Sequence, residues 1–171
     1  MKKQIICSFL VIGLFLSSAT CVFADTSNSN SLPPNQSNTI TIPIEIIQST
    51  SNNSGELMLR NATMTYNPMQ RGSRTLGADA CDPSSGVVVF HFDFTASTII
   101  DNAGLEKFVH PQSPSATLTK KNANYTNHAA SGSTSSNIRF DFSLSAKKNG
   151  NPLNRTGFFF FNGSTIVLVG I

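Results

Sequence analysis

The sequence predicts an all-β protein, an antiparallel β-sandwich with at most one short helix. Several segments alternate apolar and polar residues with a period of two, which is the spacing of a strand with one buried face. Gly, Asn, Ser and Pro separate these segments at short intervals, as in sandwiches and barrels. The dipeptide Asn162-Gly163, which suits a tight hairpin turn, joins the last two segments. A small Greek-key or meander barrel is the alternative architecture.

The two strongest strands are expected at 87–96 and 137–146. Each places four apolar side chains on its inner face, and these are Val88, Phe90, Phe92 and Phe94 in the first strand and Ile138, Phe140, Phe142 and Leu144 in the second. The opposite faces are polar and expected to be exposed, with His91, Asp93, Arg139 and Asp141 among their residues.

Three further strands are expected at 39–46, 56–67 and 115–120. The first alternates from Ile40 to Ile46, and Pro43 places it at a sheet edge or at a bulge because proline cannot donate a ladder hydrogen bond. In the second, the apolar positions change parity near Arg60-Asn61, which indicates a β-bulge.

The segments between these strands are expected to be less regular. Residues 68–86 are interpreted as one long loop. Residues 101–109 are expected to form one or two helical turns, with Asp101 as N-cap and Pro111 ending the helix.

The last two strands are expected at 157–161 and 164–169, joined by a type I′ turn at Asn162-Gly163, so that Phe161 pairs with Ser164. Both faces of this hairpin are apolar. One carries Phe159, Phe161, Ile166 and Leu168; the other carries Phe158, Phe160, Val167, Val169 and Ile171. An antiparallel sandwich normally leaves one face to water. The second face therefore needs a cover, either from within the chain (101–109 or the leader) or from a partner, and Phe158, Phe160, Val167 and Val169 are the candidate partner-binding residues.

The chain begins with the pattern of a secretory signal peptide at 1–24. Lys2 and Lys3 precede an apolar run, and Val22-Phe23-Ala24 provides a cleavage context. Residues 25–38 are too polar to bury a core and are interpreted as a flexible leader, followed by a single β domain at 39–171. The protein is therefore expected to be exported, to the periplasm, the cell surface or the medium, with no transmembrane segment after cleavage.

Charge and motifs exclude several function classes. Without Lys2 and Lys3, the 12 Lys and Arg fall to 10, against 9 Asp and Glu, so no basic surface for a nucleic acid is expected. No catalytic, cofactor or metal motif occurs; Asp79, Asp82 and Ser84 lie close together but lack the spacing of an EF-hand calcium loop. Arg71 and Arg74 in the same stretch are a weak indication of an anion site.

Two features keep chemistry open. His91 and Asp93 share one face of their strand, so a His–carboxylate pair is geometrically feasible. Cys81 is the only cysteine left after cleavage, so any disulfide it forms must join two chains. Asp79 and Asp82 flank its sulfur and disfavour a thiolate nucleophile.

These observations predict a binding, adhesion or assembly module. The expected contacts are a protein partner or self-association, through the C-terminal hairpin or the strand from Ile40 to Ile46. A polar leader followed by alternating isoleucines resembles, in pattern alone, a donor strand that completes a neighbouring sheet. Two alternatives stay open. One is a small envelope hydrolase that uses loop residues near Cys81 or the His91/Asp93 face, and the other is a carrier of lipid or another small apolar ligand.

Overall fold

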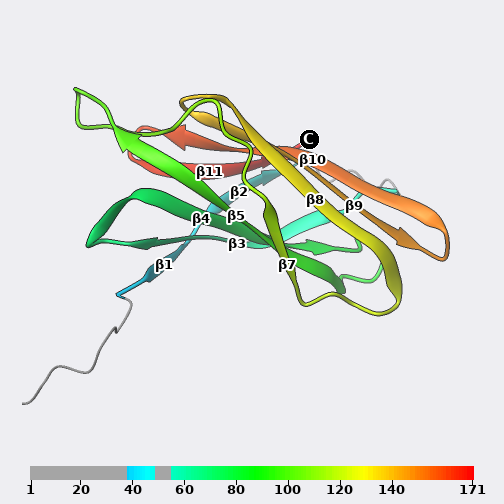
Figure 1. Cartoon of the computed structure of the whole chain (residues 1–171). Helices are drawn as coiled ribbons and strands as arrows, with labels where there is room; N and C mark the ends of the chain where they lie inside the picture. The colour runs from blue at the N-terminus through cyan, green and yellow to red at the C-terminus, as the bar shows by residue number, and fades with distance from the viewer. Residues whose placement is uncertain (1–37, 49–54) are drawn as a thin grey trace, which may run out of the picture. The chain divides into compact units, whose positions relative to one another are not determined.

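Eleven strands in two facing sheets make up the part of the chain that the computed structural model describes, residues 38–48 and 55–171 (Figure 1). The first sheet has the order β1-β3-β4-β5-β6, and β7 also pairs with β5. Its strands are β1 (Ile40–Pro43), β3 (Met58–Asn67), β4 (Gln70–Cys81), β5 (Val88–Ile100), β6 (Glu106–Phe108) and β7 (Ala116–Thr119). The predicted β-sandwich is confirmed. The predicted signal peptide and residues 25–37 of the leader lie outside the described residues.

The second sheet has the order β2-β11-β10-β9-β8. Its strands are β2 (Glu45–Gln48), β8 (Tyr125–Ser136), β9 (Arg139–Lys148), β10 (Asn151–Asn162) and β11 (Thr165–Gly170). The strands β8 to β11 follow one another as an antiparallel meander, and β2 pairs in parallel with β11. Among the described residues, no helix could cross a membrane.

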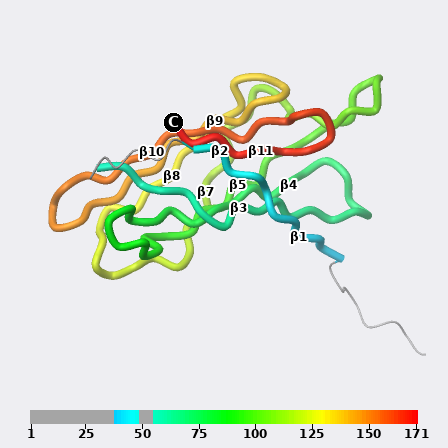
Figure 2. Tube along the Cα trace, turned by 180° about the vertical axis from the view of Figure 1, so that it is seen from behind, coloured from blue at the N-terminus to red at the C-terminus, as the bar shows by residue number. Residues whose placement is uncertain are grey.

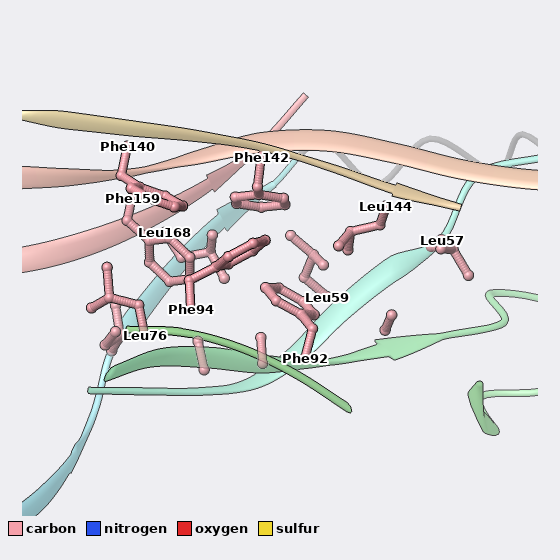
Figure 3. Close-up of a cluster of buried hydrophobic side chains, with 14 of the residues drawn as sticks. Leu57, Leu59, Leu76, Phe92, Phe94, Phe140, Phe142, Leu144, Phe159 and Leu168 are labelled. Atoms are coloured by element: carbon pink, nitrogen blue, oxygen red, sulfur yellow. The ribbon is translucent and has the colours of Figure 1, made fainter. Parts of the chain in front are cut away.

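Aromatic rings fill the space between the sheets (Figure 3). Phe92 lies 5.4 Å from Phe142 and Phe94 lies 5.1 Å from Phe140, measured between ring centroids. Phe90, Phe92, Phe140 and Phe142 are buried, as the alternation predicts. Two residues expected on the inner faces depart from the prediction. Ile138 lies in the turn before β9 and is 41% exposed, and Val88 is only part-buried, whereas its neighbour Val89 is buried.

The expected long loop at 68–86 is wrong, because most of it forms β4. The inner positions Ala78 and Ala80 are small since they pair with Phe92 and Phe90 on β5. A strand that packs beneath large rings does not need large side chains of its own. The predicted bulge is confirmed by a register shift after Arg60, where Asn61 has a φ of 51°.

The expected helix at 101–109 is also wrong. Asp101 caps a turn instead, accepting hydrogen bonds from the backbone of Ala103 and Leu105. The chain then forms β6, and Phe108 lies in the core 4.6 Å from Phe161. A turn with an aspartate at its start satisfies the same backbone groups as a helix N-cap, so the sequence pattern fits both.

The N-terminal segment passes from the first sheet to the second between β1 and β2 (Figure 2). β1 is an edge strand, as Pro43 predicts, but Ile40 and Ile42 on it are exposed, whereas Ile44 after it is buried. Gln48 at the end of β2 then bonds β3 of the other sheet, donating from Nε2 to the Leu59 carbonyl (2.9 Å) and accepting from the Leu59 amide (3.0 Å). The side-chain amide of Gln48 therefore links the end of β2 in the second sheet to β3 in the first sheet.

The C-terminal hairpin forms in a register different from the expected one. Asn162 pairs with Thr165, so Gly163 and Ser164 make the turn, and φ is positive at Gly163 (66°) but not at Asn162. The pairing is shifted by two residues relative to the type I′ prediction. A shift of two leaves every side chain on its predicted face, because the strand period is two.

Candidate functional site

The outer face of the second sheet is apolar along the C-terminal hairpin. Phe158 pairs with Val169 and Phe160 with Val167 across β10 and β11. Ile47 on β2 continues the row, because it pairs with Val169. We call this surface the hairpin face and define it by Ile47, Ile138, Phe158, Phe160, Val167 and Val169. All of these except Val167 are at least part-exposed, and Ile47 is 52% exposed.

A groove of about 420 Å³ crosses the hairpin face between Ile138, Phe158, Phe160 and Val169. Arg139 forms its polar border, with the guanidinium 3.8 Å from the centroid of the Phe158 ring. Asp141 holds the guanidinium in place, accepting from Nε (2.8 Å) and Nη2 (2.6 Å). These contacts explain why Arg139 and Asp141, expected to be exposed, are part-buried.

The segment 101–109 does not cover this face. Phe108 packs against Phe140 and Phe161, whose side chains point into the core on the opposite side of the sheet. One of the internal covers considered from the sequence is therefore excluded. The other, the leader, lies almost entirely outside the described residues.

His91 lies between two carboxylates on the outer face of the first sheet. Its Nδ1 is 2.8 Å from Asp79 and its Nε2 is 3.3 Å from Asp93, so neither His91 nor Asp93 is fully exposed, contrary to expectation. Asp79 also accepts a bond of 2.8 Å from Asn61. Burial raises the pKa of Asp79, but the hydrogen bonds from Asn61 and His91, together with the nearby charge of Lys120, outweigh it, so that its pKa is lowered. Both imidazole nitrogens of His91 are thus in contact with carboxylates.

Cys81 is a free, buried thiol at the end of β4. Burial raises its pKa and so does the charge of Asp79, while Arg60 acts in the opposite direction. A raised pKa disfavours the thiolate that nucleophilic catalysis needs. The intermolecular disulfide stays a prediction, and it would require this strand end to become accessible.

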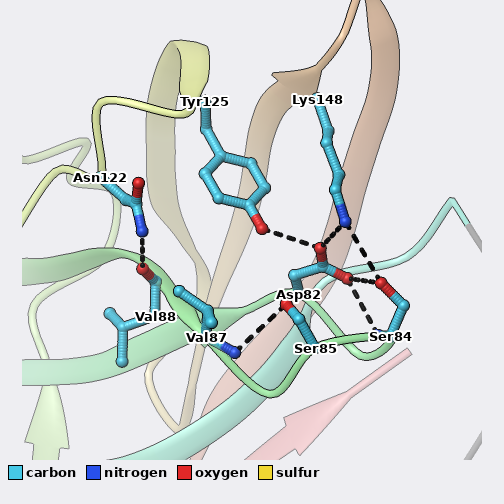
Figure 4. Close-up of polar contacts among 8 residues, drawn as sticks. All are labelled: Asp82, Ser84, Ser85, Val87, Val88, Asn122, Tyr125 and Lys148. Atoms are coloured by element: carbon cyan, nitrogen blue, oxygen red, sulfur yellow. Dashed lines mark hydrogen bonds and ion pairs between the residues drawn. The ribbon is translucent and has the colours of Figure 1, made fainter.

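A buried carboxylate joins the two sheets at Asp82 (Figure 4). It accepts hydrogen bonds from Tyr125 Oη (2.8 Å), Lys148 Nζ (2.5 Å), Ser84 Oγ (2.6 Å) and the Ser84 amide (2.9 Å). Burial raises the pKa of Asp82, but these donors, Lys148 first, hold it well below the ordinary value. Its oxygens are occupied by protein donors, so we assign the cluster a structural role. In the described ranges no three His, Cys, Asp or Glu side chains are grouped to hold a metal ion.

The sequence pattern indicated the apolar outer face of the hairpin and the pairing of His91 with Asp93. It did not indicate Asp79 as a partner of His91, or Tyr125 and Lys148 as partners of Asp82. Asp79 contacts His91 because the two residues pair across β4 and β5, and β4 was not expected to be a strand. Tyr125 contacts Asp82 because it is the first residue of β8, a strand in the opposite sheet. β8 carries small and hydroxyl side chains without a large apolar alternation, so its pattern gives little indication of a strand. Searches against protein-family models, curated proteins and solved structures found no match to this chain.

Proposed function

We propose that the chain is an exported assembly module that associates with a second copy of itself through the hairpin face. The observation that carries this proposal is the part-exposed row of Ile47, Val169 and Phe158 on a sheet whose other face already forms a complete core. Apolar area of this kind gains free energy when it leaves water, at about 25 cal/mol per Å². Export rests on the signal-peptide pattern of residues 1–24.

The charges at the border of the hairpin face favour a second copy as the occupant. Arg139 and Asp141 lie side by side next to Phe158. A two-fold axis makes one patch contact the same patch on its partner. Such an axis can place Arg139 of one copy near Asp141 of the other, with the apolar residues between them. Aromatic residues and arginine are also enriched in protein interfaces.

The two alternative functions have weaker support. A hydrolase at His91 would need a ring nitrogen free for proton transfer, and both nitrogens contact carboxylates. A lipid carrier would need an apolar cavity between the sheets. That space is occupied by phenylalanine and leucine side chains.

The test compares the wild-type protein, as exported, with the double variant Phe158→Ser/Phe160→Ser. Sedimentation equilibrium measures association, and thermal melts measure stability. We expect a wild-type dimer and a folded, monomeric double variant. Ser143→Ala, on the outer face of β9 and outside the hairpin face, is the matched control and should stay dimeric. A monomeric wild type would exclude self-association and point to a different protein partner. A double variant that unfolds would show that the hairpin face is covered within the chain, and one that still dimerises would place the interface elsewhere.

A further inference from the structure

A cleft of about 750 Å³ lies at one end of the first sheet, between the β3–β4 turn and the β5–β6 turn. Its size falls within the usual range for small-molecule sites. The lining residues that matter here are Tyr66, Arg71, Arg74, Ile99, Ile100 and Glu106. This cleft is on the other sheet from the hairpin face and involves none of its residues.

Arg74 forms a fixed wall of the cleft. Its guanidinium carbon lies 4.3 Å from the centroid of the Tyr66 ring, and its Nη2 donates to Glu106 at 2.7 Å. Glu106 is held in turn by Thr98 Oγ1, which donates to it at 2.6 Å. Only 12% of the Arg74 side chain is exposed. The wall is therefore preorganised, and its two opposite charges largely cancel.

Arg71 supplies the remaining charge. In the described part of the chain, no ion pair or side-chain hydrogen bond involves Arg71, which lies exposed at the start of β4. A guanidinium offers a planar fork of donors that fits a carboxylate with two parallel hydrogen bonds. The cleft thus presents one unpaired cation beside a neutral ion pair.

The other wall of the cleft is apolar. Ile100, at the end of β5, is 47% exposed and pairs with Glu106, so its side chain lies on the same face of the sheet as Glu106. The side chain of Ile99, the residue before it, lies on the opposite face. An anion that carries an apolar body would cover the Ile100 side chain while its charge meets Arg71. Inorganic phosphate has no apolar body to cover Ile100, so it should gain less in the cleft than an anion that carries one.

From this geometry we infer that the cleft binds a small monocarboxylate with an apolar body, the carboxylate on Arg71 and the body against Ile100. Such a group is provided by a free organic acid or by the C-terminus of a peptide that ends in an apolar residue. Tyr66, Arg74 and Glu106 act as positioning residues that keep the cleft open and shaped. The association proposed for the hairpin face is not required.

The experiment titrates the full exported protein with N-acetyl-L-leucine and follows backbone amide NMR shifts. Shifts should concentrate in β3–β4 and β5–β6 around the cleft, and raised salt should weaken them, since the contact is exposed. N-acetyl-L-leucinamide, which lacks the charge, and inorganic phosphate should both bind more weakly. A peptide that ends in leucine and its amidated form distinguish the two sources of the carboxylate. If the peptide binds and its amidated form does not, the cleft accepts a peptide C-terminus. If neither form binds, the cleft accepts a free acid alone.

Arg71→Gln should lower the affinity for N-acetyl-L-leucine about tenfold or more, because a charge-assisted hydrogen bond is lost. Lys147→Gln makes the same charge change on β9 of the other sheet and should leave the affinity unchanged. Ile100→Asp should also abolish binding, because it places an anion in the wall. The inference is overturned if the amide binds as well as the acid, if phosphate binds more tightly, if Lys147→Gln has the same effect as Arg71→Gln, or if no shifts appear at the cleft.

Discussion

Tyr125 Oη donates a 2.8 Å hydrogen bond to the buried carboxylate of Asp82, and this contact joins the first residue of β8 to the end of β4 in the opposite sheet. Lys148, at the end of β9, donates to the same carboxylate. Three segments far apart in sequence are therefore held by one ionised group.

The Asp82 contact predicts a specific loss of stability in acid. The pKa of Asp82 is lowered in the folded protein, whereas an unfolded aspartate has a pKa of about 3.9. Between these two values the unfolded state binds more protons, so stability rises with pH there. The contribution is present above about pH 4 and is lost as the pH falls towards the folded pKa.

Denaturant unfolding at pH 7 and pH 3 checks this expectation. Asp82→Asn should be less stable than wild type at pH 7, and its stability should change less between the two pH values. Glu45→Gln removes an exposed carboxylate on β2 and should behave like wild type. Equal acid sensitivity of wild type and Asp82→Asn would assign the acid effect to other groups.

The aromatic core predicts large losses on truncation. Phe92 and Phe140 are each 0% exposed, so replacing either by alanine should cost about 3–5 kcal/mol of unfolding free energy. Val87→Ala is the control, because Val87 is 43% exposed and lies outside the hairpin face, and it should cost less than about 1 kcal/mol. Urea denaturation measures all three, and a loss at Val87 equal to that at Phe92 would contradict the observed burial.

Gly157 predicts a second, steric effect. A Cβ at this position would lie 2.5 Å from the Val169 carbonyl oxygen and 2.6 Å from the Phe142 ring. Gly157→Ala should therefore destabilise the fold by about 1–3 kcal/mol through overpacking. At Gly55 the added Cβ would meet only ordinary contact, 3.8 Å from the nearest atom, so Gly55→Ala should have little effect. Melting temperatures of the two variants make the comparison.

The burial of Cys81 predicts that its thiol reacts slowly in the native state. It is 1% exposed, and burial with the nearby Asp79 raises its pKa, so a disulfide-exchange reagent should react slowly at neutral pH. The rate should rise in denaturant and at higher pH.

If an intermolecular disulfide forms, a covalent dimer should appear on non-reducing gels and be absent in Cys81→Ser. A wild type that migrates only as monomer would exclude the bridge.

The sequence predicted best where large side chains alternate. Phe90 to Phe94 and Phe140 to Phe142 are typical of strands with one buried face, and the same parity placed Phe158 and Phe160 together despite the shifted register. β4 was missed because Ala78 and Ala80 are small to accommodate the rings they pair with. Arg71 and Arg74 gave a weak indication of an anion site, but the cleft that they line was not predicted. Tyr66 and Glu106 reach it only through the pairing of β3, β4, β5 and β6, and no local pattern encodes that pairing.

The parallel pairing of β2 with β11 has a mechanical consequence. These are the first and last strands of their sheet along the chain, with Glu45 beside Val167 and Gln48 beside Gly170. When the two ends of the domain are pulled apart, the load runs along both strands and shears their hydrogen bonds together instead of opening them one at a time. The Gln48 amide adds a crosslink to the first sheet at the end of this pair. A domain tethered at one end and pulled at the other should therefore resist extension, and Gln48→Ala should lower the unfolding force in single-molecule pulling.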